Sequence, residues 1–241
     1  SFTAEDLLQA ARRRGEAMRD AAAHVAGAMI AARASIERIR GAGIDAIDGV
    51  VIANHNAPEQ VVLSGTVDGI DRAEVALKAA NISCARLPVS TAFHSPLVAP
   101  AVAAFRSTLD DIAVESPLTP VFSNANGKPF PTDAAAIRDQ LANQIAAPVR
   151  FVEQILTMAD TGIRTFIEVG PSSVLSELVD AVLAGQPHQA IPLDRKGQDG
   201  VVAWHRALAR LVALGVTMRP DALWQEFEAL PPRPEAKKLT L

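Results

Sequence analysis

Residues 27–89 alternate between strand-like and helix-like patterns, and this alternation constrains the fold more than any other feature of the sequence. Strand-like runs occupy Gly27–Ala32, Val50–Asn54, Val61–Ser64 and Ile82–Val89, and helical periodicity occupies Ala34–Arg40 and Ile70–Ala80. Turns that contain glycine or proline separate these segments. The order strand, helix, strand, strand, helix, strand is that of a ferredoxin-like unit. The sequence therefore predicts a ferredoxin-like small subdomain over residues 27–89.

The rest of the chain predicts a larger α/β unit. Strand-like runs are Pro120–Asn124, Thr165–Val169 and Gln189–Pro192, and helical periodicity covers Glu5 to about Ala23, Ala134–Ala146, Pro148–Asp160, Ser172–Leu183 and Gln198–Leu214. Such alternation predicts a parallel sheet covered by helices on both faces. In the last helix we expect Trp204, Leu208, Leu211 and Val212 to be buried.

These patterns divide the chain into four parts. Residues 1–26 form a helix of the large subdomain, and residues 27–89 form the small subdomain. Residues 90–219 form the large α/β subdomain, and the proline-rich residues 220–241 form a linker after it.

Composition and charge exclude several classes of protein. The net charge of −4 comes without a basic stripe, which argues against a nucleic-acid partner. No apolar run approaches the roughly 20 residues that cross a bilayer, and no secretory signal opens the chain, so we expect no membrane partner. The single cysteine, Cys84, suits a small buried strand position and a reducing compartment, so we expect a cytoplasmic protein. The histidines show no metal-ligand spacing, and we expect no metal site.

The loop Val89–Leu97 carries the residue that points most directly to chemistry. It follows a strand, and Pro96 begins a helix in which apolar residues recur at helical spacing. His94 therefore lies between a strand and a helix, where catalytic groups are common, and imidazole transfers protons near neutral pH. We predict that His94 is a general base. The alternative is a loop histidine that caps the helix or contacts solvent.

The motif Ala92-Phe93-His94-Ser95-Pro96 resembles the catalytic-histidine loop of the malonyl-type acyltransferases of polyketide and fatty acid synthases. Three further blocks resemble the same family in the same order, namely residues 14–18 (Arg-Gly-Glu-Ala-Met), residues 54–65 (Asn-His-Asn-Ala-Pro-Glu-Gln-Val-Val-Leu-Ser-Gly) and residues 168–175, which begin Glu-Val-Gly-Pro. The resemblance implies an α/β-hydrolase-like parallel-sheet core with the ferredoxin-like subdomain inserted in it. It also implies malonyl transfer from coenzyme A to the pantetheine thiol of an acyl carrier protein, through a Ser/His acyl-enzyme and without a cofactor.

The nucleophile of that family is missing from these residues. The family carries a Gly-His-Ser-x-Gly elbow, in which a serine on a sharp strand-to-helix turn is activated by the histidine. No Gly-x-Ser-x-Gly occurs in the sequence, and the family places the elbow shortly before the block of Arg14. We therefore expect this chain to be the C-terminal portion of an acyltransferase. Its expected partners are an N-terminal segment that carries the serine, and an acyl carrier protein.

The resemblance assigns a role to each of four residues. His94 takes the serine proton and later the proton of the carrier thiol. Arg14 pairs with the free malonyl carboxylate, since a guanidinium fits a carboxylate through two parallel hydrogen bonds. Gln144 lies in the segment whose backbone carbonyl orients the histidine ring, and Phe93 accompanies a preference for malonyl over methylmalonyl. Thr91 departs from the malonyl pattern, in which a histidine is common at this position.

Each assignment has a simpler alternative. Arg14 could be one of several arginines on a solvated helix face, and Gln144 an exposed glutamine at a helix end. For the chain as a whole, the leading interpretation is a malonyl-CoA:acyl-carrier-protein transacylase domain of a polyketide or polyunsaturated fatty acid synthase. The alternative is a non-catalytic acyltransferase-like fragment that docks a carrier protein, and a hydrolase is a more distant third.

Overall fold

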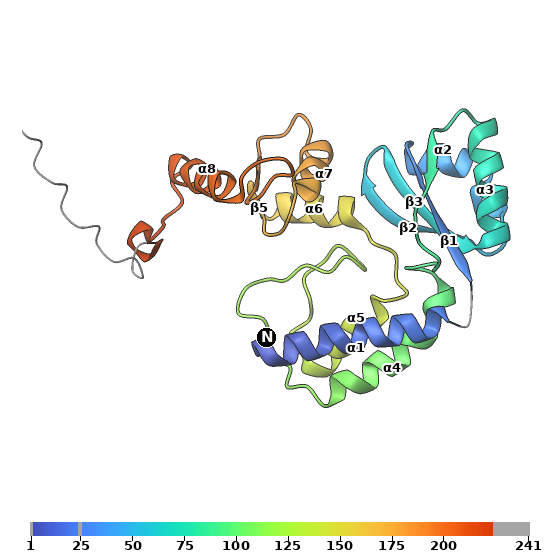
Figure 1. The fold of residues 1–241 in the computed structure, drawn as a ribbon, viewed down its shortest axis with the longest axis horizontal. Coiled ribbons are helices and arrows are strands. Elements are labelled where there is room, and N and C mark those ends of the chain that lie inside the picture. The colour runs from blue at the N-terminus through green and yellow to red at the C-terminus, as the bar shows by residue number, and fades with distance from the viewer. Residues whose placement is uncertain (1, 24–25, 224–241) are drawn as a thin grey trace, which may run out of the picture.

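The computed structural model describes residues 2–23 and 26–223. Figure 1 shows an antiparallel sheet with two helices at one end of the molecule and a helical bundle beside it. A smaller α/β group lies between the four-stranded sheet and the last helix, α8 (Gly200–Ala213). Each of the first three groups has a buried apolar cluster of its own. The molecule is therefore an α/β fold, as the sequence predicts.

The first helix, α1 (Ala4–Ala22), begins within one residue of the predicted position because Thr3 caps it. The Thr3 hydroxyl accepts a hydrogen bond from the backbone N–H of Asp6 at 3.1 Å, which satisfies one of the free donors of the first turn. Ala10 and Ala21 on its inner face share a buried cluster with Phe105 of α4 (Pro100–Asp110). The helix therefore packs along α4 in the bundle of Figure 1.

Residues 27–86 form a four-stranded antiparallel sheet with the predicted element order. Its elements are β1 (Gly27–Ala32), α2 (Ile36–Gly41), β2 (Val50–Ala57), β3 (Gln60–Thr66), α3 (Val67–Ala79) and β4 (Cys84–Arg86). The strands lie in the order β2-β3-β1-β4, and every neighbouring pair is antiparallel. Because side chains alternate along a strand, Ile30 and Leu63 pack beneath the helices while Met29 and Val62 lie on the opposite face.

Two details of this sheet differ from the sequence-based expectation. Strand β4 is shorter than the predicted Ile82–Val89, and it lies at the sheet edge. Cys84 is consequently only half-buried, so the prediction of a buried cysteine is wrong. Strand β2 is longer than predicted and contains irregular register between Ile52 and Asn54 and again between His55 and Ala57. Such bulges bend a strand and redirect its side chains.

Residues 96–160 contain the remaining helices of the bundle and the helix that follows them. One helix was expected from Pro96, but a 3₁₀ turn over Pro96–Val98 precedes α4, because Pro100 has no N–H and takes the first position of a new helix. The bundle is completed by α5 (Ala134–Asn143), and α6 (Phe151–Asp160) follows it.

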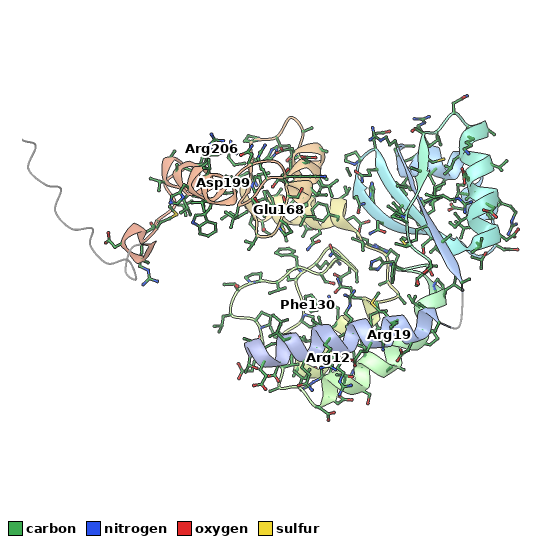
Figure 2. All side chains as sticks on the ribbon, viewed as in Figure 1. Arg12, Arg19, Phe130, Glu168, Asp199 and Arg206 are labelled. Atoms are coloured by element: carbon green, nitrogen blue, oxygen red, sulfur yellow. The ribbon has the colours of Figure 1, made fainter. Side chains whose placement is uncertain are left out.

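The predicted strand Pro120–Asn124 is wrong. Phe122 forms only an isolated bridge with Pro129, and Phe130 (labelled in Figure 2) donates its N–H to the carbonyl of Val121 at 2.7 Å. The segment therefore folds back on the residues just after it, and these local hydrogen bonds leave it outside any sheet of the described residues.

The parallel sheet is smaller than predicted. Among the described residues it consists of β5 (Thr165–Glu168) and β6 (Gln189–Pro192), which pair in parallel around α7 (Val174–Val182). Beyond β6, α8 buries the stripe Ala203, Ala207 and Leu211, whereas Trp204 is 38% exposed and Val212 is 58% exposed. The expectation that both of these were buried is wrong, because they lie off that stripe.

The predicted linker 220–241 is described only at its start. Pro220–Leu223 forms a 3₁₀ turn, and residues 224–241 lie outside the described residues.

Arg138 of α5 provides a test of how the bundle is held together. Its guanidinium donates hydrogen bonds to the carbonyl of Leu109 (2.8 Å), in the last turn of α4, and to that of Ile112 (2.9 Å), two residues beyond the helix. We expect Arg138→Ala to lower the free energy of unfolding by about 1.5–3 kcal/mol, since hydrogen bonds to charged groups are worth that much.

Urea denaturation of the full chain measures this change. Arg40→Ala is the matched control, because Arg40 forms only an exposed ion pair with Asp45 and should change stability by less than about 0.5 kcal/mol. Equal effects of the two substitutions would contradict the proposed role of Arg138.

Candidate active site

The loop that carries His94 is fixed by close packing and by Ser95. The buried hydroxyl of Ser95 donates to the carbonyl of Ala92 at 2.7 Å and accepts from the N–H of Leu97 at 3.3 Å. A Cβ atom on Gly27 would lie 2.4 Å from the backbone nitrogen of Ala92, so only glycine permits this approach of β1 to the loop. His94 itself has a φ of +56°, an uncommon conformation for a residue other than glycine. The loop therefore holds its histidine in one defined position.

The ring of His94 is oriented by a backbone carbonyl. Its Nδ1 lies 3.1 Å from the carbonyl oxygen of Ala147. A carbonyl can only accept a hydrogen bond, so Nδ1 carries the proton and Nε2 keeps its lone pair. The sequence placed this role on Gln144, whereas the carbonyl that forms the hydrogen bond is that of Ala147, three residues further along. The Gln144 carbonyl acts on the pKa of His94 as the smallest of four influences.

The pKa of His94 is lowered from its ordinary value. Burial is the largest influence, because it disfavours the charged imidazolium. The Ala147 carbonyl opposes this shift, and the positive charge of Arg14 lowers the pKa further. The imidazole is therefore neutral at pH 7 and is able to accept a proton through Nε2.

The segment of Ala147 is tied to the four-stranded sheet. Val149 donates its N–H to the carbonyl of Ala53 at 2.7 Å and accepts from the N–H of His55 at 2.9 Å. This short parallel bridge joins the irregular part of β2 to the chain between α5 and α6. The sheet therefore positions the carbonyl that orients His94.

His94 and Phe93 line one cleft of about 420 Å³. The other lining residues come from α1, from the open face of the sheet and from the chain after β4, and are Met18, Met29, Asn54, Asn56, Val62, Leu87 and Val89. Phe93 packs on this open face with Met29 and Val62. A larger cavity of about 590 Å³, which includes the turn between β2 and β3, has no histidine in its lining, so the cleft beside His94 is the candidate site.

Sequence reasoning missed Asn54 and Asn56 as lining residues. Both stand on β2 and belong to the block over residues 54–65, although the predicted strand ended at Asn54. The polar residues at the start of that block were the available signal. The bulges in β2 were not predictable, and they decide which way these side chains face.

Arg14 differs from its neighbours on α1 in having no carboxylate partner among the described residues. Arg12 and Arg13 both bond to Glu16, at 2.9 and 3.2 Å, and Arg19 bonds to Asp20 at 3.3 Å. Figure 2 labels Arg12 and Arg19, which mark the two ends of this arginine-rich stretch. Arg14 instead acts through its charge on His94, and Met18, one turn further along the helix, lines the cleft. Its guanidinium is therefore available to an anion near the cleft.

Glu168 has a structural role. Its carboxylate accepts hydrogen bonds from the N–H groups of Leu175 (3.0 Å) and Ser176 (2.8 Å) and from the Ser176 hydroxyl (2.8 Å). These contacts cap the start of α7, next to β5, where Figure 2 labels Glu168. The carboxylate of Glu168 therefore stabilises the start of α7.

The described part of the chain offers neither a cluster of metal ligands nor a helix that could span a membrane. Residues 2–23 and 26–223 contain no group of three or more His, Cys, Asp and Glu side chains arranged to hold a metal ion. None of the helices in those ranges has the length and apolar character that spanning a membrane requires.

Comparison with known proteins finds a family model and several similar chains. A family model described as the acyl transferase domain matches residues 1–218. The malonyl CoA-acyl carrier protein transacylase of Bacillus subtilis is 35% identical over 183 residues, which are 74% of this chain and 57% of that protein. Among solved structures, the acyltransferase domain from the second module of the salinomycin polyketide synthase has a TM-score of 0.81 at 30% identity, over 95% of this chain and 54% of that one.

A third relative was solved with a carrier protein. The structure holds a type II polyketide-synthase acyl carrier protein in complex with its malonyl-transacylase. The matched chain has a TM-score of 0.72 at 29% identity, over 82% of this chain and 62% of that one. In each of these three comparisons the chain spans less than two thirds of its relative.

The influences on the pKa of His94 give a prediction for the site. We expect its imidazole to titrate below the ordinary value of about 6.5 in an NMR pH titration of the full chain. Since the folded pKa is lowered, the neutral ring contributes stability that is fully present above about pH 6.5 and is lost as the pH falls through the folded pKa. Arg14→Ala should raise the pKa, because it removes a nearby positive charge.

Arg19→Ala is the control, since Arg19 is exposed, paired with Asp20 and absent from the influences on His94. An Arg14→Ala titration that coincides with that of the unaltered chain would show that Arg14 does not reach the cleft electrostatically.

Proposed function

This chain belongs to the acyl transferase domain family, and on that premise we propose that it supplies the general base and the carboxylate-binding arginine of a malonyl-CoA:acyl-carrier-protein transacylase. The observation that carries the proposal is the neutral imidazole of His94, held through Nδ1 by Ala147 with Nε2 free, in the same cleft as Phe93. The 241 residues contain no Gly-x-Ser-x-Gly, so the proposed nucleophile is a serine on a segment outside them.

The proposed reaction has two halves that use His94 in the same way. In the first, Nε2 takes the serine proton while the serine oxygen attacks the malonyl thioester carbonyl; the C–S bond then breaks, and the coenzyme A sulfur leaves with the proton. In the second, Nε2 takes the proton of the carrier's pantetheine thiol, whose sulfur attacks the malonyl-serine ester. The serine oxygen leaves and recovers its proton from His94. The histidine returns to its neutral form after each half.

Arg14 is proposed to select the carboxylated acyl group. Its guanidinium has no carboxylate partner among the described residues, and it lies close enough to His94 to lower the pKa of the ring. A malonyl carboxylate would supply the missing counter-charge through two parallel hydrogen bonds. Phe93, packed against Met29 and Val62, would then limit the space beside the acyl α-carbon. One methyl group changes such discrimination by about 1–3 kcal/mol.

Coenzyme A and the acyl carrier protein both present their thiol on a pantetheine arm. The cleft contains polar side chains that could bind the amides of this arm. Asn54 and Asn56 line the cleft and have no side-chain hydrogen bond within the described part of the chain. Carboxamide side chains both donate and accept, so they match the amides of a pantetheine arm. The relative solved with its acyl carrier protein supports a carrier protein as the partner.

The proposed architecture follows the same family. We assign residues 27–89 to a ferredoxin-like subdomain inserted in an α/β-hydrolase-like core, and β5 and β6 to the parallel sheet of that core. Ile167 (45% exposed) and Val169 (81% exposed) lie on or beside β5 and would pack against the serine-bearing segment. Residues 1–26 and 90–219 complete the large subdomain in this assignment, and residues 220–241 follow it as a linker.

Complementation tests the proposal. The chain alone should form no malonyl-enzyme, whereas co-expression with a segment that carries the Gly-His-Ser-x-Gly elbow should give labelling from radioactive malonyl-CoA and transfer to a carrier protein. In that complex, His94→Ala should slow labelling about 100-fold or more, the scale of a lost general base. His205→Ala, on the exposed face of α8, is the matched control and should leave the rate unchanged.

Two outcomes would count against this proposal. Malonyl transfer by the chain alone would place the nucleophile among its own residues. Unchanged labelling of the His94→Ala complex would remove His94 from the reaction.

Arg14→Ala tests substrate selection separately. In the same complex it should reduce malonyl transfer at least tenfold while acetyl transfer stays equal or improves, because only the malonyl group loses a counter-charge. The ratio of kcat/KM for the two acyl-coenzyme A substrates measures this change, with Arg19→Ala as the control. Equal losses for both substrates would indicate that Arg14 is structural.

A further inference from the structure

A second pocket, of about 250 Å³, lies between the end of β6 and α8. Figure 1 shows that α8 lies beyond β5, on the side away from the four-stranded sheet. The pocket shares no lining residue with the cleft of His94. Its floor is apolar and buried, made of Ile191, Pro192, Ala203 and Ala207, and its rim is made of Arg195, Gln198, Arg206 and Arg210. Three guanidinium groups therefore border one small hollow.

Local structure brings these arginines together. Arg206 and Arg210 stand four residues apart on α8, so they share one face of that helix with the buried Ala203 and Ala207. Arg195 comes from the loop before α8, which turns at Gly197 with a φ of +82°. Figure 2 labels Arg206 on α8, with Asp199 at the start of the same helix.

The positive charges of the pocket are not neutralised by the described residues. Arg210 donates to the amide oxygen of Gln189 at 2.7 Å, and Arg206 to that of Gln198 at 3.4 Å, and both acceptors are uncharged. None of the three arginines forms an ion pair within residues 2–23 and 26–223. The amide contacts fix the direction of two guanidiniums and leave the charge uncompensated.

Two carboxylates close in sequence to the pocket residues accept hydrogen bonds from backbone N–H groups. Asp194 accepts the N–H of Arg195 at 2.8 Å, and Asp199 caps α8 through the N–H of Val202 at 3.0 Å. The three arginines are exposed on the rim of the pocket, and an anion between them would relieve the repulsion of their like charges.

We propose that this pocket binds a phosphate group. A phosphate monoester carries close to two negative charges at pH 7 and three terminal oxygens, one for each guanidinium, whereas a carboxylate carries one charge and two oxygens. The apolar floor excludes water from one side and so strengthens the charge interaction. The pocket has room for the phosphate and a few of the atoms attached to it. This proposal is independent of the reaction proposed for His94.

Titration of the full chain with inorganic phosphate tests the site. Isothermal calorimetry at constant ionic strength should show one saturable site, with chloride giving none and acetate, a single carboxylate, binding at least tenfold more weakly. Arg206→Gln and Arg210→Gln should each weaken phosphate binding at least tenfold. Arg40→Gln and Arg72→Gln are matched controls, because those arginines are exposed and paired with Asp45 and Asp68, and they should bind phosphate as the unaltered chain does.

A thermal melt of each variant in chloride separates a lost site from a lost fold. If Arg206→Gln fails to fold, Arg195→Gln, in the loop before α8, replaces it. Equal binding by the cluster variants and the controls would overturn the proposal, and so would the absence of saturation. Acetate binding as tight as phosphate binding would overturn the assignment of a phosphate group.

Discussion

The hydrogen bond between Nδ1 of His94 and the carbonyl of Ala147 joins residues 53 positions apart, and the geometry of the cleft depends on it. Ala147 is held because Val149 exchanges backbone hydrogen bonds with Ala53 and His55 of β2. The sheet, the histidine loop and the chain after α5 therefore fix the imidazole together. The left-handed backbone of His94 costs on the order of 1–3 kcal/mol, which the contacts of Ser95 and Ala147 offset. A loop with fewer contacts would relax to a more common conformation and turn the ring away from the cleft.

Burial and charge act together on the same imidazole. Burial keeps the ring neutral, and a neutral ring with its proton on Nδ1 is the form that accepts a proton at Nε2. The positive charge of Arg14 also favours the neutral imidazole. Arg14 itself has no carboxylate partner within the described residues, whereas its neighbours on α1 form ion pairs with Glu16 and Asp20. In the proposed reaction one cation thus serves two purposes, since it disfavours imidazolium before binding and attracts the substrate's carboxylate.

The two sheets of the molecule differ in how completely they are covered. The helix-bearing face of the four-stranded sheet is closed, with Ile30, Leu63 and Leu77 fully buried. The opposite face stays partly open and forms the floor of the cleft. The parallel pair β5 and β6 leaves Ile167 and Val169 exposed, and the pocket beyond it has an excess of positive charge. Surfaces of these kinds are where partners and ligands are expected to bind.

Local sequence determined much of the fold. The bounds of β1 and β6 and the start of α1 followed from short-range patterns, because strand periodicity and the Thr3 cap act within a few residues. The order of elements in residues 27–86 followed for the same reason. The motif around His94 also placed a histidine between a strand and a helix, since that needs only local turns.

Tertiary structure decided the contacts between distant segments. Which carbonyl meets the His94 ring depends on how the chain after α5 docks on β2, and so Ala147 rather than Gln144 makes the hydrogen bond. The bulges of β2 directed Asn54 and Asn56 to the cleft, and pairing with residues 128–130 kept residues 120–124 out of a sheet. The exposure of Trp204 followed from which stripe of α8 met β6. A periodic pattern specifies the conformation of a segment, but the face it buries and the partner it meets are set by packing with residues far away in the chain.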